Sequence, residues 1–220
     1  MPNVLITGAN RGLGLEFARQ YAAQGWTVFA TCRHPEQATA LHALGGTVFP
    51  VDVTDPAAIT ALVAGLDGQP LDLLINNAGI YGPQGSDPAA WAEVFAVNVI
   101  APVRLAEALL SNLLAGTQRK VAFLSSQMGS IADNSSGGSM IYRSSKAALN
   151  AAVHGLAIDW RKQGIIVLAL HPGWVRTDMG GPQAPLTPDQ SITGLRCVIA
   201  SATLSESGGF RNYLGQTVPW

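Results

Sequence analysis

Tyr142 and Lys146 lie four residues apart in the segment Tyr-Arg-Ser-Ser-Lys. On a helix this spacing puts both side chains on one face, with the ammonium beside the phenol. A tyrosine in water has a pKa of about 10, and lowering this pKa by about three units takes roughly 4 kcal/mol. One unit charge at ~4 Å supplies this energy at an effective dielectric of ~20. The pair therefore predicts a tyrosine that exchanges protons near neutral pH. The alternative is a chance pair on an exposed helix.

A glycine-rich segment, Thr7-Gly8-Ala9-Asn10-Arg11-Gly12-Leu13-Gly14, follows a short apolar run and opens a helical pattern. Glycines in this context permit a tight turn, a close approach of the backbone to a pyrophosphate, and close helix–strand packing. The free amides at the helix N-terminus attract the phosphates. An ordinary strand–helix turn is the alternative. The segment predicts a dinucleotide site with contacts from Gly8, Asn10, Arg11, Gly12, Leu13 and Gly14.

The end of the second expected strand predicts which dinucleotide binds. A cofactor without a 2′-phosphate usually meets an Asp or Glu there, about 20 residues after the glycine loop. This strand ends in Ala30-Thr31-Cys32-Arg33, which contains no acid, and Arg33 and Arg11 could both face a 2′-phosphate. NADP(H) is therefore expected rather than NAD, with solvated surface arginines as the alternative.

Short apolar runs alternate with longer helical patterns along the chain, which is typical of an α/β protein whose parallel sheet is covered on both faces. The 220 residues fit one domain, 1–220. Loops at 128–140 and 180–188 are long enough to cover a site. Strands are expected at 3–6, 27–31, 47–51, 71–75, 120–124, 165–170 and 210–214, and helices near 12–24, 35–44, 56–66, 88–115, 141–163 and 188–201.

Polar residues follow other expected strands, at the edge where doubly wound sheets bind ligands. Asp52-Val53 follows the third strand, where a carboxylate can accept from adenine, although Asp52 could equally cap the next helix. Asn76-Asn77-Ala78-Gly79 follows the fourth strand. Ser126 ends the fifth strand and could share a carbonyl oxygen with Tyr142. The segment from Pro172 to Thr177 follows the sixth strand and can wrap a nicotinamide.

Composition excludes several classes of partner. The net charge is −1, which favours neither nucleic acid nor an anionic membrane. The two cysteines have no metal-ligand neighbours in sequence, so we expect no metal site and a reducing, cytoplasmic setting. We expect no signal peptide, and no apolar stretch close to the ~18 residues of a membrane span.

These motifs, in this order, resemble the short-chain dehydrogenase/reductase family over essentially the whole chain. The resemblance rests on Thr-Gly-x-x-x-Gly-x-Gly, Asn-Asn-Ala-Gly, Tyr-x-x-x-Lys and Pro-Gly-x-x-x-Thr. The segments at 125–131 and 171–179 and the final Pro219-Trp220 are similar to the sniffer/C-factor-like carbonyl reductase branch. The resemblance implies a single-domain Rossmann fold with a doubly wound, seven-stranded parallel sheet and helices on both faces.

The resemblance also implies a site. Asn98 would hold a water in a proton relay, Ser126 would bind the substrate oxygen, Tyr142 would be the acid/base, and Lys146 would tune Tyr142 and bind the nicotinamide ribose. The family activity would be NADPH-dependent reduction of a small carbonyl compound, with an NADP-binding signalling or sensor protein of C-factor type as the alternative. A homodimer or homotetramer is expected by analogy. Cofactor contacts are expected from the glycine loop and Arg33, and from Asp52, Val53, Asn77, Ala78, Gly79, Tyr142, Lys146, Pro172, Gly173, Val175 and Thr177.

Overall fold

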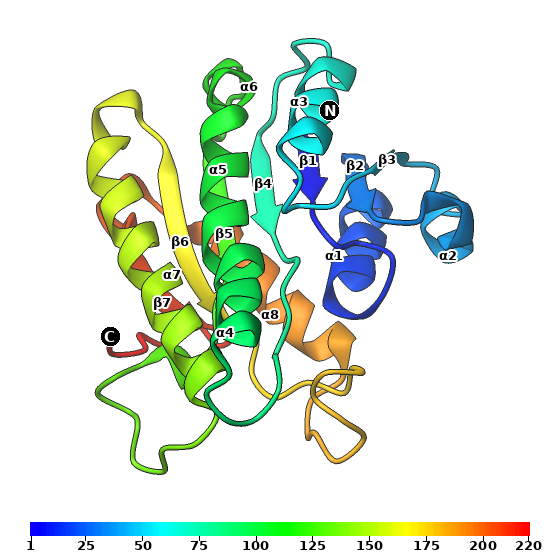
Figure 1. The fold of residues 1–220 in the computed structure, drawn as a ribbon. Helices are drawn as coiled ribbons and strands as arrows, with labels where there is room; N and C mark the ends of the chain where they lie inside the picture. The colour runs from blue at the N-terminus through cyan, green and yellow to red at the C-terminus, as the bar shows by residue number, and fades with distance from the viewer.

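A computed structural model covers residues 1–220 and contains one seven-stranded sheet (Figure 1). Every strand pair is parallel, and the strand order is β3-β2-β1-β4-β5-β6-β7. This confirms the expected seven-stranded parallel sheet. The strands are β1 (Asn3–Ile6), β2 (Thr27–Cys32), β3 (Thr47–Pro50), β4 (Leu73–Asn76), β5 (Lys120–Leu124), β6 (Ile166–His171) and β7 (Gly209–Asn212).

Helices cover both faces of the sheet. One face carries α3 (Pro56–Gly65), α4 (Pro88–Phe95), α5 (Ala101–Ala108), α6 (Leu110–Ala115) and α7 (Met140–Asp159), and the other carries α1 (Gly12–Ala23), α2 (Thr39–His42) and α8 (Pro188–Ser201). Figure 1 shows α5 and α7 in front of the sheet and α8 behind it. Alternate strand residues enter two separate cores: Leu5 and Leu74 pack in the first, and Val4 and Ile75 in the second. The five inner strands, β2, β1, β4, β5 and β6, are apolar almost throughout because both their faces are buried, whereas the edge strands β3 and β7 are partly exposed.

The strand order reverses next to β1. β2 and β3 lie on one side of β1, while β4 and the later strands lie on the other. The loops that leave the carboxyl ends of β1 and β4 therefore part in opposite directions and leave a crevice between them. The glycine-rich segment and the Asn-Asn-Ala-Gly segment both begin at this crevice.

Two expected helices are interrupted. The expected helix at 35–44 is a 3-10 turn, Pro35–Gln37, followed by the short α2, because Ala38 has a non-helical ψ of 50°. The expected helix at 88–115 contains a π-helical turn, Ala96–Ile100, and ends its α5 segment before Leu109. Pro102 explains the π turn, since it has no N–H to donate to the carbonyl of Asn98 four residues earlier.

The helical run Pro88–Ala108 is more apolar than the sequence analysis expected. It has 21 residues and a mean hydropathy of 1.4 over its most apolar window, which is enough by length and composition to cross a membrane. In the fold it covers one face of the sheet, with Val94, Leu105 and Ala106 buried. Core helices of globular proteins pass the same test, so the run is weak support for a membrane span.

Candidate active site

Tyr142 and Lys146 lie on the buried face of the first turns of α7. Their exposed fractions are 8% and 5%. Lys146 Nζ lies 5.7 Å from the centre of the Tyr142 ring and donates a hydrogen bond of 2.8 Å to the main-chain oxygen of Leu124. Leu124 is the last residue of β5, so the carboxyl end of this strand fixes the ammonium beside the phenol.

Burial decides the charge states of this pair. Burial raises the pKa of Tyr142 to about 12, against a hydrogen bond with Ser126 that lowers it, and the nearby Tyr81 adds to the increase. Burial also lowers the pKa of Lys146 to about 8. The net pKa of Tyr142 is thus raised, where the sequence analysis expected a lowered value, because desolvation penalises the charged form of both groups and is the largest effect on each. Tyr142 is therefore protonated at neutral pH, which is the form that donates a proton.

Asn98 lies in the π turn and is 1% exposed. Its Oδ1 accepts from the Ile80 amide at 2.9 Å, and its Nδ2 donates to the Ile80 carbonyl at 2.8 Å and to Ser145 Oγ at 3.0 Å. A Cβ on Gly79 would lie 3.2 Å from Asn98 Oδ1 and 3.6 Å from Lys146 Nζ. Gly79 therefore lets the Asn98 side chain and the Lys146 ammonium approach the same point.

The two adjacent serines after β5 have different partners. Ser125 Oγ donates to Asn150 Oδ1 at 2.6 Å and is buried. Ser126 accepts from the Met128 amide at 3.2 Å and interacts with the Tyr142 hydroxyl. Ser126 is thus the serine that lies beside the tyrosine, as the sequence analysis expected.

A cleft of about 500 Å³ runs along the carboxyl edge of the sheet, at the crevice beside β1. It joins the Tyr142–Lys146 pair to the glycine loop. Most of the residues expected to bind the cofactor line it: Gly8, Asn10, Arg11, Gly12, Leu13, Arg33, Asp52, Val53, Asn77, Ala78, Gly79, Tyr142, Lys146, Pro172 and Thr177. Three expected residues, Gly14, Gly173 and Val175, do not line it.

The glycine loop is held in shape by the fourth strand. Asn77 Nδ2 donates to the carbonyls of Thr7 at 2.8 Å and Gly8 at 3.1 Å. Thr7 Oγ1 accepts in return from the amides of Asn77 and Ala78, both at 3.0 Å. Gly12 has a φ of 55°, and a Cβ there would contact only the Thr177 side chain. The loop therefore offers an open cradle, which fits a pyrophosphate.

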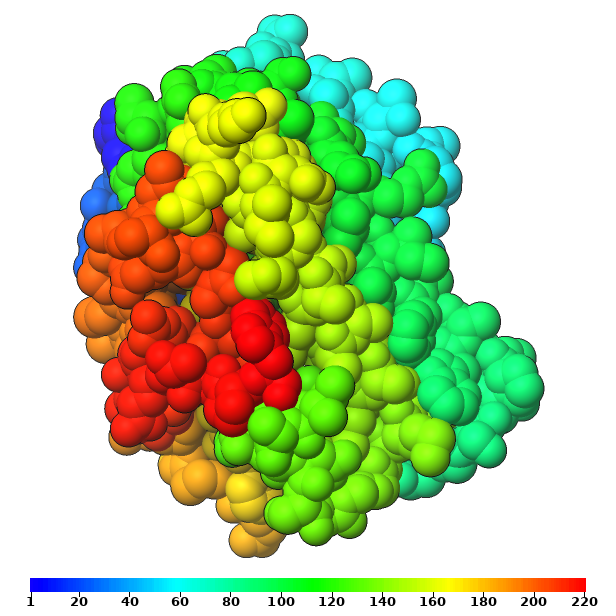
Figure 2. Space-filling view, turned by 90° about the vertical axis from the view of Figure 1, so that its left-hand side faces the viewer, coloured from blue at the N-terminus to red at the C-terminus, as the bar shows by residue number.

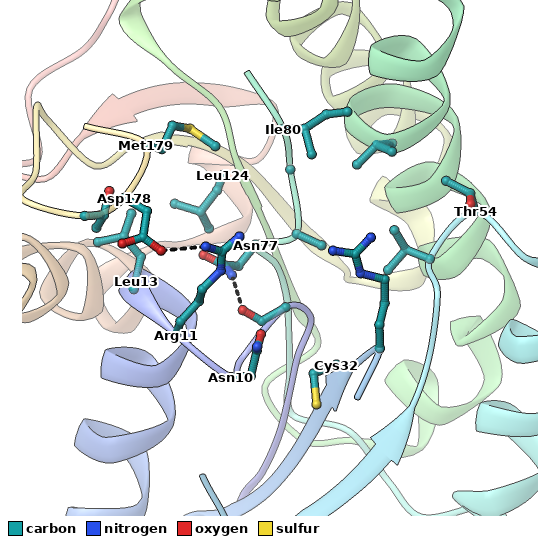
Figure 3. A pocket seen from close by; sticks show the side chains of 18 of the residues that line it. Asn10, Arg11, Leu13, Cys32, Thr54, Asn77, Ile80, Leu124, Asp178 and Met179 are labelled. Atoms are coloured by element: carbon teal, nitrogen blue, oxygen red, sulfur yellow. Dashed lines mark hydrogen bonds and ion pairs between the residues drawn. The ribbon is translucent and has the colours of Figure 1, made fainter. Parts of the chain in front are cut away.

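The two arginines that were expected to meet a 2′-phosphate differ in their surroundings. Arg11 Nη1 forms an ion pair with Asp178 Oδ2 at 2.5 Å, which joins the glycine loop to the loop after β6 (Figure 3). Arg33 lines the cleft with no hydrogen bond or ion pair of its own. Asp52 has a lowered pKa because Thr54 donates hydrogen bonds to it and Arg33 adds a weaker charge effect. Arg33 is thus an unpaired cation in the part of the cleft that Asp52 and Thr54 also line.

Comparison with known proteins decides the family. The family model described as short chain dehydrogenase matches residues 2–186. The chain belongs to this family.

Three similar proteins extend this finding. The C-signal protein of Myxococcus xanthus is 45% identical over 155 residues, which cover 69% of this chain and 93% of that protein. The structure of the carbonyl reductase Sniffer of Drosophila melanogaster has a TM-score of 0.93 and 35% identity, with full coverage of both chains. The NADPH-bound carbonyl reductase from chicken fatty liver has a TM-score of 0.94 and 37% identity, covering 100% of this chain and 99% of that one. The chain is thus an oxidoreductase of the short-chain dehydrogenase family with the fold of these carbonyl reductases.

Sequence reasoning assigned no role to two residues of this short-chain dehydrogenase that the structure places at the site. Thr7 is the acceptor that joins the glycine loop to Asn77, and a threonine at the end of a buried strand was the available signal. Tyr81 stacks on Tyr142, with ring centres 4.5 Å apart and planes at 26°. No spacing rule connects Tyr81 to a residue 61 positions later in the chain, so only the fold could show this contact.

Gly14 of the short-chain dehydrogenase glycine motif packs where no side chain fits. A Cβ there would lie 2.6 Å from Asn77 Nδ2 and 2.9 Å from Ala9 Cα, which confirms the close helix–strand packing expected of this glycine. We expect Gly14→Ala to lower the free energy of unfolding by about 3 kcal/mol through overpacking. Gly155→Ala is the matched control, because Gly155 is helical with open space around it and should gain about 0.5–1 kcal/mol. Urea denaturation measures both; equal effects at the two sites would contradict the packing argument.

Proposed function

We propose that this short-chain dehydrogenase reduces a ketone or aldehyde to an alcohol with NADPH. One observation carries the proposal: a buried, protonated Tyr142 lies beside the Lys146 ammonium and Ser126, at the end of a cleft whose far end holds the unpaired Arg33. A proton donor and a phosphate-binding cation at opposite ends of one cleft suit a proton-coupled reduction by a phosphorylated dinucleotide.

In the proposed mechanism the side chains position the carbonyl and provide its proton. Ser126 and the Tyr142 hydroxyl both donate to the carbonyl oxygen, where negative charge grows as the carbon is reduced. Tyr142 transfers its proton to that oxygen, and the Lys146 ammonium stabilises the phenolate that remains. The cofactor, when bound, supplies the hydride.

Asn98 positions the surrounding backbone in this proposal. Its amide fixes Ile80, and its Oδ1 lies on the same side of Gly79 as Lys146 Nζ. A water held between these two atoms would return a proton to Tyr142 after each turnover. This relay remains a prediction.

The residues that line the cleft fit NADP(H). The open glycine cradle suits the pyrophosphate, Asp52 suits the adenine amino group, and Arg33 suits the 2′-phosphate. Pro172 and Thr177 also line the cleft, and in this proposal the segment that contains them contacts the nicotinamide half of the cofactor. Arg11 would reach a 2′-phosphate only by breaking its ion pair with Asp178. We therefore assign most of the binding of the 2′-phosphate to Arg33.

Removal of the Arg33 guanidinium should weaken NADPH binding selectively. We expect Arg33→Ala to raise the Kd for NADPH about 10- to 100-fold, since a charge-assisted hydrogen bond contributes about 1.5–3 kcal/mol. The Kd for NADH should change less than about threefold, because NADH has no 2′-phosphate. Fluorescence titration measures both constants, and Arg104→Ala, which removes an exposed arginine of α5, is the control. A similar loss of affinity for NADH and NADPH would contradict the assignment.

The reaction class is tested by NADPH consumption, followed optically, with a panel of ketones, aldehydes, quinones and cyclic imines. We expect turnover with at least one carbonyl class. A second candidate function, an NADP-binding signalling protein with little turnover, is supported by the 45% identity to C-signal. Tight NADPH binding without consumption across the panel would favour that candidate and overturn the reductase.

The remaining expectations are part of the same proposal. Residues 1–220 act as one NADP-binding domain in the cytoplasm, on a small carbonyl compound, without nucleic acid or membrane. The partly exposed helix α7 suits a homodimer or homotetramer, and Ile158 of α7 is more than half exposed in the single chain. Light scattering of the purified protein tests the oligomeric state.

A further inference from the structure

The segment between the turn after β5 and α7 has no core of its own. All residues from 131 to 138 are exposed, including Ile131 at 77%. We call this segment the 131–138 loop. Because it buries no apolar side chain, hydrogen bonds to the rest of the molecule decide its shape.

Arg143, the residue after Tyr142, makes three of these hydrogen bonds, and Gln127, Ser130 and Trp220 make one each. Its Nε donates to the carbonyls of Gly137 at 3.0 Å and Gly138 at 3.1 Å, and its Nη2 donates to Ser136 Oγ at 2.9 Å. A longer bond of 3.4 Å joins Nη1 to the Met128 carbonyl, before the loop begins. One planar guanidinium on the helix that carries Tyr142 thus contacts both the end of the loop and Met128, which precedes the loop.

Both ends of the loop also converge on the aromatic stack at the site. The Tyr81 hydroxyl lies 2.8 Å from Ser139 Oγ and 3.9 Å from Met128 Sδ, so it contacts the residues that flank the loop on each side. The ring of Tyr81 stacks on Tyr142. The base of the loop therefore lies against the proton donor.

Trp220 makes a further contact with the 131–138 loop. The Ala132 amide donates to the main-chain oxygen of Trp220 at 2.9 Å, and the Trp220 ring stacks on Phe210 of β7. Figure 2 shows the green residues of the loop region packed against the red end of the chain. Of the residues that form these contacts with the loop, only Arg143 belongs to the helix that carries Tyr142 and Lys146.

We propose that Arg143 is a positioning residue that holds the 131–138 loop as one wall of the carbonyl-substrate site. The guanidinium then governs the affinity for the carbonyl substrate and leaves NADPH binding unchanged, because neither Arg143 nor the loop lines the cofactor cleft. This inference rests on the proposed reductase function. It adds to that function a residue that controls substrate binding without touching the cofactor.

Three variants test the inference. Arg143→Met keeps the side-chain length and removes every donor, Arg143→Lys keeps the charge as a single point donor, and Ser136→Ala removes one acceptor. Arg104→Met is the control, since Arg104 is an exposed arginine with no side-chain partner. For each variant we measure kcat and KM for the best carbonyl substrate of the panel, the Kd for NADPH, the melting temperature, and amide hydrogen exchange of the loop.

For Arg143→Met we expect KM to rise about tenfold, corresponding to about 1.4 kcal/mol of lost substrate binding, with kcat within about threefold. The Kd for NADPH should stay constant, and exchange should accelerate in the 131–138 loop. Arg143→Lys should raise KM less than Arg143→Met does, and Ser136→Ala should also raise KM less than Arg143→Met does.

Two results would overturn the inference and leave the proposed reductase function intact. The first is an unchanged KM in an active Arg143→Met enzyme. The second is a fall in kcat with KM constant, which would show that Arg143 acts on Tyr142 and not on the 131–138 loop. Failure of the proposed function looks different, because the wild-type enzyme would then consume no NADPH with any carbonyl.

Discussion

Tyr142→Phe should lower the rate of carbonyl reduction by about 100- to 10,000-fold, the usual contribution of a positioned proton donor. The substitution removes only the hydroxyl, and the phenylalanine ring can keep its stacking on Tyr81 at 4.5 Å. The Kd for NADPH should change less than about threefold, since the fold and the cleft remain. Steady-state kinetics and fluorescence titration on the same preparation measure the two quantities.

Tyr213→Phe is the matched control for Tyr142→Phe. Tyr213 also packs close to the loop after β6, where its ring approaches Gly173, but its hydroxyl forms no hydrogen bond. The control enzyme should keep nearly the full rate. If Tyr142→Phe retained most of its carbonyl-reducing activity, the proton would come from another group and the assignment of Tyr142 as the acid would be wrong.

Lys146→Met should lower activity and raise stability at the same time. Activity should fall about 100-fold, because a cation that stabilises developing charge is lost. Stability should rise by about 1–2 kcal/mol at pH 7, since the substitution removes a buried charge whose pKa is lowered to about 8 by burial. The loss of the 2.8 Å bond to the Leu124 carbonyl offsets part of this gain.

The pH dependence of stability tests the cause of this gain. The pKa of Lys146 is about 8 in the folded protein and 10.5 in a reference lysine. Between these values the unfolded chain binds more protons, so the wild-type protein should become more stable as pH rises from about 8 to about 10.5. Below pH 8 both states carry the charge and the folded state bears the full penalty.

Thermal unfolding across this pH range compares wild type, Lys146→Met and Lys162→Met, which removes an exposed lysine as the control. Lys146→Met should melt about 2–8 °C higher than wild type at pH 7, and its advantage should shrink above pH 8. An equal or lower melting temperature would show that the bond to Leu124 outweighs the burial of the charge.

Local sequence patterns predicted most of the fold and most of the cleft. The five inner strands are short apolar runs bounded by glycine, proline or polar residues, and this pattern indicates burial of both faces directly. Glycines at 8, 12 and 14 and the absence of an acid from the strand end at 30–33 are equally local signals. They indicated the cofactor cleft because strand ends in a parallel sheet lie along one edge whatever the details of packing.

Helix interruptions were harder to predict. The helical pattern from 88 to 115 contains Pro102. Only the structure shows that the helix continues past this proline, with a π turn just before it. The turn matters because it contains Asn98, whose amide reaches Ile80 and Ser145. Those partners lie 18 and 47 positions away in sequence, outside any local pattern.

By itself, the sequence determined that Tyr142 and Lys146 share a helix face, that Ser126 follows a strand, and that a glycine-rich loop joins the first strand to the first helix. Only the tertiary structure decided the charge states of that pair. Spacing fixes the distance between a phenol and an ammonium, but the pKa of each also depends on the water that the rest of the fold removes. Here burial is the largest effect on both groups, so Tyr142 has a pKa of about 12 and Lys146 a pKa of about 8. The tie from Arg143 to the 131–138 loop was likewise decided by the fold, because its acceptors are main-chain carbonyls that no side-chain pattern records.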